Sequence, residues 1–468
     1  MKITLKNHIE ITDIDEQEQE LIEMLCTHDN PKFEEAKKQG RYTGKILREI
    51  KTFSRVDDGL VVPIGTLSWL ETGLYDNEPT TREKQDDGFI PDLSHWPEID
   101  DQRNSHPVTI PFMGELRPYQ EAFVQNLINA EGGVGGVGVA ATGAGKTVSG
   151  IALAARLGQR CLILVNSGAL ATQWQAAGKQ FTGLEFGMIG GGKNTQGEQF
   201  TIGLVQTLVN RNLSALDYGL VIADECHNAP ASQFYTVING INAQYKYGLS
   251  ATPQRRDSME FMIHAALGEI TATIEADQLM GKVLPVEVRT INIDFDGEVN
   301  DWNGFVKTLI DDDSRNDWII RLARQQVRPT IILCSQVRHC EILTTLAAEA
   351  GLKPLLIHGQ LQAKVRAERM AAAQTARLII GTAQLMGEGL DIPHLEVLIF
   401  AAPMSAVIEK AGEPAATKLI QSIGRCRRPF KGKTHAIVYD LIDRCGFGIA
   451  AAKKRGQIYR LQGFEVGA

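Results

Sequence analysis

Short, continuous apolar runs recur along most of this chain, and stretches with helical spacing separate them. The runs lie at 137–139, 162–165, 202–205, 220–223, 330–333, 355–357, 378–380, 397–400 and 436–439. Strands that are apolar on both sides must be covered on both faces, which is typical of parallel sheets with helices packed on each side. A polar tract at roughly 285–328 divides the runs into two sets. The pattern therefore predicts an α/β protein with two parallel-sheet domains in series and ligands at the carboxyl ends of the strands.

The first 110 residues lack this rhythm, and we interpret them as a small accessory domain followed by a linker. They hold 13 Lys and Arg against 23 Asp and Glu, a balance of −10, whereas the rest of the chain holds 35 against 33, a balance of +2. The acidity of the chain, −8 overall, is therefore local. We expect three parts: an accessory domain at 1–110, a first α/β domain at 111–285 and a second at 286–468.

One basic stretch interrupts the acidic front part. It comprises Lys37, Lys38, Arg41, Lys45, Arg48, Lys51 and Arg55, with Tyr42 and Phe53 interleaved. Such a stretch either binds the phosphates of a nucleic acid or forms a solvated surface without a partner. The sequence does not decide between these two roles.

The composition narrows the class of protein. Seven cysteines are scattered without CxxC pairs, which predicts reduced thiols in a cytosolic protein and no zinc site. No run approaches the ~20 apolar residues that a membrane-crossing helix needs. We therefore expect a protein of the cytoplasm.

A glycine-rich segment, AATGAGKT at 140–147, follows the first apolar run. Glycines let backbone N–H groups close around phosphates, while Lys146 reaches the β and γ phosphates and Thr147 places its hydroxyl on Mg²⁺ at a helix N-terminus. The usual pattern has glycine where this chain has Ala140, and a small residue still fits the turn. The predicted nucleotide cradle comprises Thr142, Gly143, Ala144, Gly145, Lys146 and Thr147.

An acidic pair follows the run at 220–223. Asp224 would hold Mg²⁺ together with Thr147, and Glu225 would orient and deprotonate the attacking water.

Several segments over about 115–430 resemble, in the right order, the motifs of the superfamily 2 helicases of DEAD/DEAH type. They include the phosphate loop in this form and Asp224-Glu225-Cys226-His227, which is the DECH variant of the family's acidic motif. In style they are similar to phage branch-migration helicases and to the motor subunits of type I and III restriction enzymes. The resemblance implies two tandem RecA-like domains behind the accessory domain. It also implies a protein of a bacterial or phage-infected cell, associated with the nucleoid. It also implies that Arg117 and Gln120, in Leu-Arg-Pro-Tyr-Gln, bind adenine, which makes the nucleotide ATP. His227, Ser250 and Thr252 would couple hydrolysis to movement.

The resemblance extends to the second domain. Gln421, Arg425 and Arg428 lie in a Q-x-x-G-R-x-x-R segment whose arginines would stabilise the γ-phosphate as charge develops. The family more often has glycine where this chain has Arg427, so three cations compete for that role. Gly389 and Asp391 would contact the nucleotide ribose. Residues in track-lining segments are Asn166, Gln173, Val205, Gln206, Thr207, Ser335, Gln336, His358, Gly359 and Thr382.

These assignments predict an ATP- and Mg²⁺-dependent DNA helicase or translocase, with the phosphate loop on one domain and the arginines on the other. We expect a monomer or a partner-dependent motor. RNA stays open as the nucleic acid, because readout of the 2′-OH is invisible in a sequence. The same motifs would also suit an ATP-gated clamp that does not step, or the motor subunit of a restriction or defence complex. The stretch at 405–417 is longer than expected and is either a surface loop or a strand-separating pin.

Overall fold

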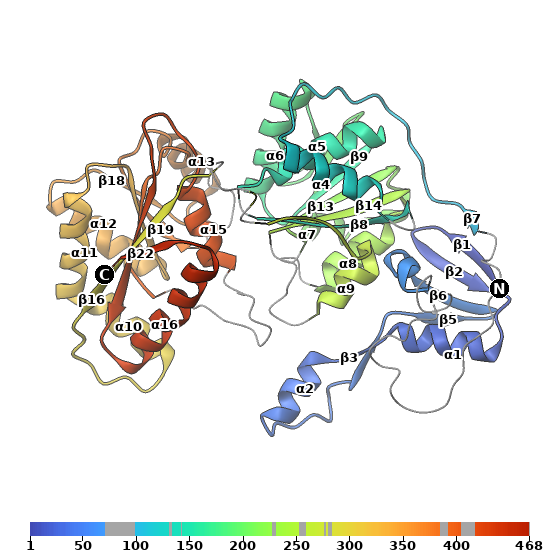
Figure 1. Cartoon of the computed structure of the whole chain (residues 1–468), viewed down its shortest axis with the longest axis horizontal. Coiled ribbons are helices and arrows are strands. Elements are labelled where there is room, and N and C mark those ends of the chain that lie inside the picture. Colours follow the sequence, from blue (N-terminus) through green and yellow to red (C-terminus); the bar gives the residue numbers. More distant parts are fainter. Residues whose placement is uncertain are drawn as a thin grey trace. The chain divides into compact units, whose positions relative to one another are not determined.

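A computed structural model describes residues 1–70, 99–130, 133–141, 143–226, 231–251, 259–275, 278, 283–383, 392–403 and 417–467. The chain divides into two compact units. The first contains residues 1–140 and 145–274, and the second contains residues 141–144 and 275–468. Figure 1 shows the elements of both units along the chain.

The N-terminal part of the first unit is a small sheet with its own core. Its strand order is β5-β6-β2-β1-β7, and all pairs are antiparallel except β1 with β7. The strands are β1 Lys2–Leu5, β2 His8–Thr12, β5 Ser54–Val56, β6 Gly59–Pro63 and β7 Ile99–Asp101. Alternate residues are buried along β1 and β2, as expected for a sheet with one solvated face. Helix α1, Glu16–Leu25, begins at a capping box between Asp15 and Glu18.

A projection leaves this sheet after α1. Two short strands, β3 Thr27–Asp29 and β4 Glu49–Lys51, pair antiparallel at its base. Between them lies helix α2, Pro31–Lys38, followed by a loop. We call residues 30–48 the arm; in Figure 1, α2 and its loop extend from β3 and β4 away from the five-stranded sheet.

The rest of the first unit is built on an eight-stranded sheet of order β11-β10-β12-β9-β13-β14-β8-β15. All pairs are parallel except β10 with β11. The strands are β8 Gly135–Ala140, β9 Cys161–Val165, β10 Gly187–Gly190, β11 Lys193–Thr195, β12 Phe200–Leu204, β13 Leu220–Asp224, β14 Tyr245–Ser250 and β15 Ile270–Ile274. The helices are α4 Pro118–Ile128, α5 Lys146–Leu157, α6 Gly168–Thr182, α7 Val205–Leu208, α8 Ala231–Gly240 and α9 Glu260–Leu267.

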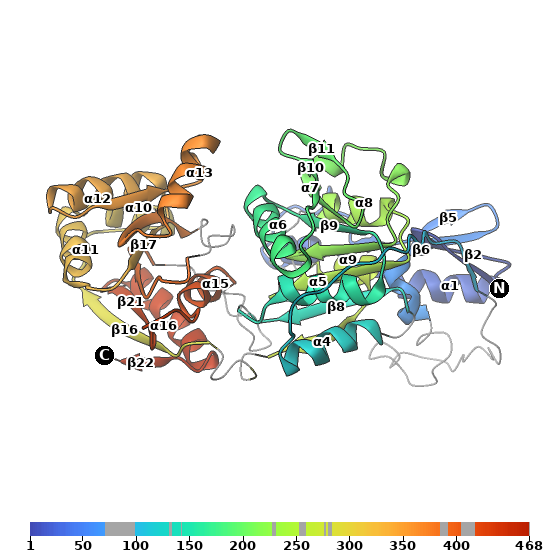
Figure 2. The ribbon, with the colours of Figure 1, turned by 90° about the horizontal axis from the view of Figure 1, so that it is seen from above.

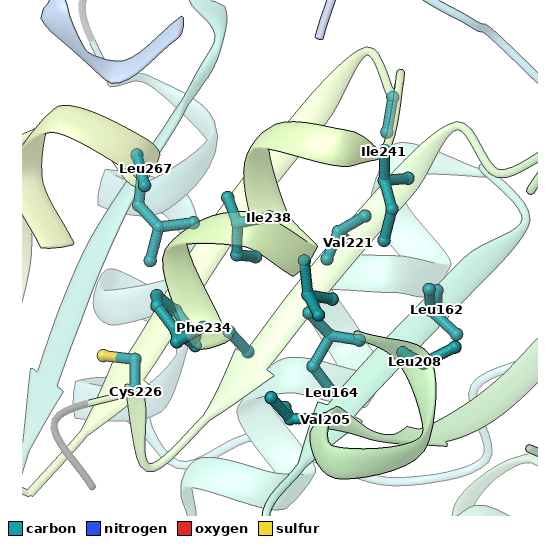
Figure 3. Packing of buried hydrophobic residues seen from close by; sticks show 14 of the residues in the cluster. Leu162, Leu164, Val205, Leu208, Val221, Cys226, Phe234, Ile238, Ile241 and Leu267 are labelled. Carbon is teal, nitrogen blue, oxygen red and sulfur yellow. The ribbon is translucent and has the colours of Figure 1, made fainter. Parts of the chain in front are cut away.

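Helices cover both faces of this sheet, with α4, α5 and α6 on one and α7, α8 and α9 on the other (Figure 1). Figure 3 shows the second face from close by: Phe234, Ile238 and Ile241 pack against Leu164 and Val221. Fully apolar strands are thus buried from both sides, as the runs predict.

The second unit is a seven-stranded sheet of order β18-β19-β17-β20-β21-β16-β22, parallel throughout its described pairs. Its strands are β16 Val286–Ile293, β17 Thr330–Cys334, β18 Pro354–Ile357, β19 Leu378–Thr382, β20 Val397–Phe400, β21 Ala436–Asp443 and β22 Glu465–Gly467. Its helices are α10 Trp302–Asp311, α11 Asp313–Gln325, α12 Val337–Glu349, α13 Ala363–Ala372, α15 Thr417–Cys426 and α16 Gly446–Leu461. Helices α11 and α12 pack on one face, and α15 and α16 on the other. Figure 2 shows the unit from a second direction.

The small accessory domain predicted at the front of the chain is present, and two details of the strand pattern need revision. The tract at 285–328 contains β16, α10 and α11, and β16 is an interior strand between β21 and β22. It alternates rather than running continuously apolar, because only one of its sides is deeply buried. The predicted strand at 202–205 ends at Leu204, and Val205 begins a helix.

The N-terminal sheet is attached to the first parallel sheet by polar contacts and by shared core. Lys246 Nζ on β14 donates to the carbonyl oxygens of Asn7 (3.1 Å) and Ile238 (2.9 Å). Trp69 Nε1 donates to Glu269 Oε1 at 2.5 Å. Val134, just before β8, packs in the core of the N-terminal sheet. The two sheets are therefore parts of one unit.

The seven cysteines are thiols rather than disulfides, as the sequence predicts. Within the described ranges, no helix has the length and apolarity needed to cross a membrane.

Candidate functional site

The phosphate loop connects β8 to α5. Gly143 and Gly145 have φ of +93° and +89°, a region that favours glycine, so the loop depends on these two residues. Ala140 is the last residue of β8 and is fully buried, which explains why a small residue suffices there. Thr142 lies outside the described residues.

Lys146, the first residue of α5, lies between the loop and the acidic pair. Its Nζ is 3.4 Å from the Ala140 carbonyl oxygen and 3.4 Å from Glu225 Oε1. Both side chains of the ion pair are mostly buried. The pair brings together two residues, far apart in the sequence, to which we assign phosphate binding and water activation.

Asp224 and Glu225 stand at the carboxyl end of β13, beside the loop. Burial, and then the neighbouring Glu225 carboxylate, raise the pKa of Asp224 to about 6, while Lys146 acts in the opposite direction. Glu225 has φ of +50°, an uncommon conformation for a residue other than glycine. This conformation turns the chain sharply at the end of the strand.

Two consecutive residues of α6 fasten the groups that would hold a metal ion. Trp174 Nε1 donates to Asp224 Oδ2 at 2.7 Å, and Gln173 Nε2 donates to Thr147 Oγ1 at 3.1 Å. Trp174 is fully buried. Because their partners are adjacent in the helix, Thr147 and Asp224 are held near each other. The sequence places Gln173 on the nucleic-acid track, whereas its amide bonds to the phosphate-loop threonine.

The adenine-binding candidates lie at the start of α4. Gln120 Oε1 accepts from the Arg117 backbone N–H at 3.0 Å, and its side chain is almost entirely buried. A Cβ on Gly145 would lie 2.4 Å from Gln120 Nε2, so the amide packs directly against the phosphate loop. Arg117 Nη1 donates to the Tyr119 hydroxyl.

The first unit also places part of the predicted track. Gln206 Nε2 donates to the Asn166 carbonyl oxygen at 3.0 Å, which joins the segments after β9 and β12. Thr207 is half-buried beside them. Val205 is 2% exposed and its side chain lies in the core shown in Figure 3, and its predicted nucleic-acid contact stays a prediction. Ser250 is buried at the end of β14, next to β8.

The second unit gathers its predicted track residues at one edge of its sheet. Cys334 pairs with Thr382 and Ile357 with Gly381, so the ends of β17, β18 and β19 are level. Ser335, Gln336 and Gly359 are exposed there. His358 and Thr382 are buried.

The three arginines at the end of α15 and just beyond it are not equivalent. Arg427 Nε donates to the Leu284 carbonyl oxygen at 3.0 Å, and its guanidinium lies 5.3 Å from the centre of the Phe464 ring. Burial lowers the pKa of Arg427 and of Arg428. Arg427 therefore has a role in the fold, which leaves Arg425 and Arg428 as the candidates for the γ-phosphate.

Several predicted site residues lie outside the described part of the chain, namely His227, Thr252, Gly389, Asp391 and the stretch at 405–416. The backbone of Gln421 belongs to α15, and its side chain lies outside the described part.

The donor set in the first unit fits Mg²⁺. A threonine hydroxyl and a carboxylate are hard oxygen ligands, and few protein ligands are usual when phosphates complete the shell. Among the residues that the structure describes, no group of three or more His, Cys, Asp or Glu could hold another metal ion.

Comparison with known proteins gives an independent view of both units. The family model "Type III restriction enzyme, res subunit" matches residues 113–255, and "Helicase conserved C-terminal domain" matches residues 314–429. "Probable helicase D10" of Escherichia phage T5 is 26% identical over 384 residues, which cover 79% of this chain and 80% of that protein.

Two further similarities bear on the activity and on the fold. The "ATP-dependent DNA helicase uvsW" of Enterobacteria phage T4 is 24% identical over 310 residues, covering 61% of this chain and 60% of that protein. A fragment of an HsdR subunit of a type I restriction enzyme from Vibrio vulnificus superposes with a TM-score of 0.52 at 16% identity, covering 71% of this chain and 65% of that one. This last likeness shows the fold alone, two RecA-like domains.

Proposed function

The chain is a superfamily 2 helicase, an enzyme that hydrolyses ATP, and we propose that it uses this hydrolysis to move along or remodel DNA. The observation that carries the proposal is the cluster of Lys146, Glu225, Asp224 and Thr147 at the carboxyl ends of β8 and β13. DNA is favoured because the phage T4 relative is described as a DNA helicase. The cytoplasm is the expected compartment.

In this proposal each residue of the cluster has a separate task. Lys146 exchanges its ion pair with Glu225 for the β and γ phosphates, because a triphosphate offers more negative charge than one carboxylate. Glu225, released from Lys146, orients the attacking water and accepts its proton. Thr147 and Asp224 hold Mg²⁺, which when bound neutralises charge on the phosphate oxygens.

The second unit completes the reaction. Arg425 or Arg428 supplies positive charge to the γ-phosphate as the bond to the leaving group breaks. Because the two sets of residues belong to different units, hydrolysis requires the two units to approach each other. This coupling of hydrolysis to domain movement makes the enzyme a motor.

The first test is the ATPase rate with and without DNA. We expect DNA to raise the rate of the wild-type chain, and Lys146→Ala and Glu225→Gln each to lower kcat by about 100-fold or more. A purified Glu225→Gln chain that hydrolyses ATP at the wild-type rate would overturn the assignment of the base.

The same assay distinguishes the nucleic acids. Stimulation by single-stranded, duplex or branched DNA and not by RNA of matched sequence supports the proposal. Stimulation by RNA alone would make the protein an RNA helicase. Strand displacement then separates a stepping motor from an ATP-gated clamp.

A further inference from the structure

The arm, residues 30–48, carries a strong local charge on an acidic domain. It contains Lys32, Lys37, Lys38, Arg41, Lys45 and Arg48 against Glu34 and Glu35, a balance of +4. The other residues of 1–110 hold 7 cations against 21 acids, a balance of −14. Positive charge is thus concentrated on the arm, which projects from the described part of the domain.

The arm contributes little to the core of the protein. Ala36 is the one buried residue of α2. Lys37, Lys38, Arg41, Lys45 and Arg48 are exposed, and within residues 1–70 none of these five has an ion pair. Arg55, at the end of the basic stretch, differs because it forms a two-pronged pair with Glu23. Among the described residues, these five cations therefore form no ion pair that ties them to the fold.

The arm is nevertheless held at its base. Asn30 accepts from the Lys32 backbone N–H through its side-chain oxygen and donates through Nδ2 to the Leu47 carbonyl oxygen at 2.8 Å. Its backbone N–H donates to the Arg48 carbonyl oxygen at 2.9 Å. The two ends of the arm are fastened together by one buried asparagine, so the arm is an ordered projection.

Two apolar side chains stand near its far end. Tyr42 is 79% exposed and Leu47 is 77% exposed, the second and third highest values among the described large hydrophobic residues that are exposed. The Tyr42 ring lies close to Gly44: a Cβ added to this glycine would be 2.3 Å from the hydroxyl oxygen of Tyr42. An aromatic ring held out among cations matches the combination that binds nucleic acid, with cations on the phosphates and a ring stacked on an unpaired base.

We propose that the arm is a second DNA-binding element, separate from the track along the two sheets. Lys37, Arg41 and Lys45 contact the phosphate backbone of a duplex, and Tyr42 stacks on a base exposed where that duplex branches or frays. This inference rests on the proposed function, since it assumes that DNA is the substrate. According to this inference, the arm causes the protein to bind branched DNA more tightly than plain duplex DNA.

The test compares a charge-reversed arm with a matched control. The arm variant is Lys37→Glu/Arg41→Glu/Lys45→Glu, and the control is Lys453→Glu/Lys454→Glu/Arg460→Glu, three exposed cations of α16. Both change the charge equally. We expect both to keep the wild-type melting temperature and ATPase rate without DNA.

Binding to a labelled fork should separate them. For the arm variant we expect Kd to rise by about tenfold or more near 100 mM salt, and the slope of log K against log salt to lose about one unit per phosphate contact. The control should match the wild type. Tyr42→Ala should reduce the preference for a fork over a plain duplex, and Tyr42→Phe should retain it.

Equal Kd and salt slope for the arm variant and the wild type would overturn the inference, and so would a loss of affinity for RNA alone. If the charge-reversed chain fails to fold, Lys37→Gln/Arg41→Gln/Lys45→Gln gives the same comparison of slopes. Failure of the proposed function looks different, because DNA would then not stimulate even the wild-type ATPase.

Discussion

Trp174 and Asp224 illustrate how one side chain sets the position of another in this protein. The indole N–H donates to Asp224 Oδ2, and the ring packs against the Cα of Gly150 on α5. Because this hydrogen bond fixes Oδ2, it also fixes the direction in which Oδ1, the other oxygen of the buried carboxylate, points. Trp174 is therefore a positioning residue for the proposed metal ligand.

Replacing Trp174 by Phe should lower ATPase activity while largely preserving the packing. We expect kcat to fall by about tenfold and the Mg²⁺ concentration for half-maximal activity to rise by a similar factor, the usual cost of losing a partner of a metal ligand. Tyr218→Phe is the matched control, since this buried hydroxyl donates to Gln196 on the same unit. A kcat loss without any change in Mg²⁺ dependence would assign Trp174 a structural role only.

Individual residues also show the limit of sequence patterns. The loop, the acidic pair and the arginines can be found because their chemistry requires neighbours at fixed spacing. The contact between Trp174 and Asp224 joins residues 50 positions apart and carries no spacing signal. Arg427 resembles its neighbours in sequence, and only its contacts with Leu284 and Phe464 distinguish it.

At the scale of elements, predictability follows burial. Strands β9, β13, β17 and β19 are buried at every residue, so their continuous apolar runs identify them. Strand β16 alternates, and β3, β4 and β7 have three residues each. Such strands form because distant partners pair with them, which a local pattern does not contain.

The junction between the N-terminal sheet and β14 depends on a buried lysine. Burial lowers the pKa of Lys246 to about 7. A neutral amine has two N–H groups, and Lys246 donates to two carbonyl oxygens, those of Asn7 and Ile238. The neutral form therefore suits the site.

This junction predicts a pH dependence of stability. Between about pH 7 and the ordinary lysine pKa near 10.5, the unfolded chain binds a proton at Lys246 that the folded chain does not. The free energy of unfolding should therefore rise with pH in that window, by up to about 1.4 kcal/mol per pH unit. Urea unfolding between about pH 7 and pH 9.5 should show the wild type gaining stability relative to Lys246→Met, while exposed Lys193→Met follows the wild type. Parallel curves for wild type and Lys246→Met would contradict the assignment.

At the scale of the whole molecule, the proposed ATP site needs residues from both units. Lys146 belongs to the first unit and Arg425 to the second. One chain carries both units, so the second unit is tethered to the first. Its effective concentration there is about millimolar, and another copy in solution would match it only at about that protein concentration. We therefore expect each chain to complete its own site.

Mixing two defective chains tests this expectation. Lys146→Ala lacks the phosphate contact and Arg425→Ala lacks the proposed charge on the γ-phosphate, yet each retains the half that the other has lost. At micromolar protein with saturating DNA, the ATPase rate of an equimolar mixture should equal the mean of the two variants, because an intact half on another copy competes poorly with the tethered one. A wild-type and Lys146→Ala mixture, expected at half the wild-type rate, is the control for poisoning through association. Recovery of activity in the first mixture would show that two copies share a site, and the motor would then be an oligomer.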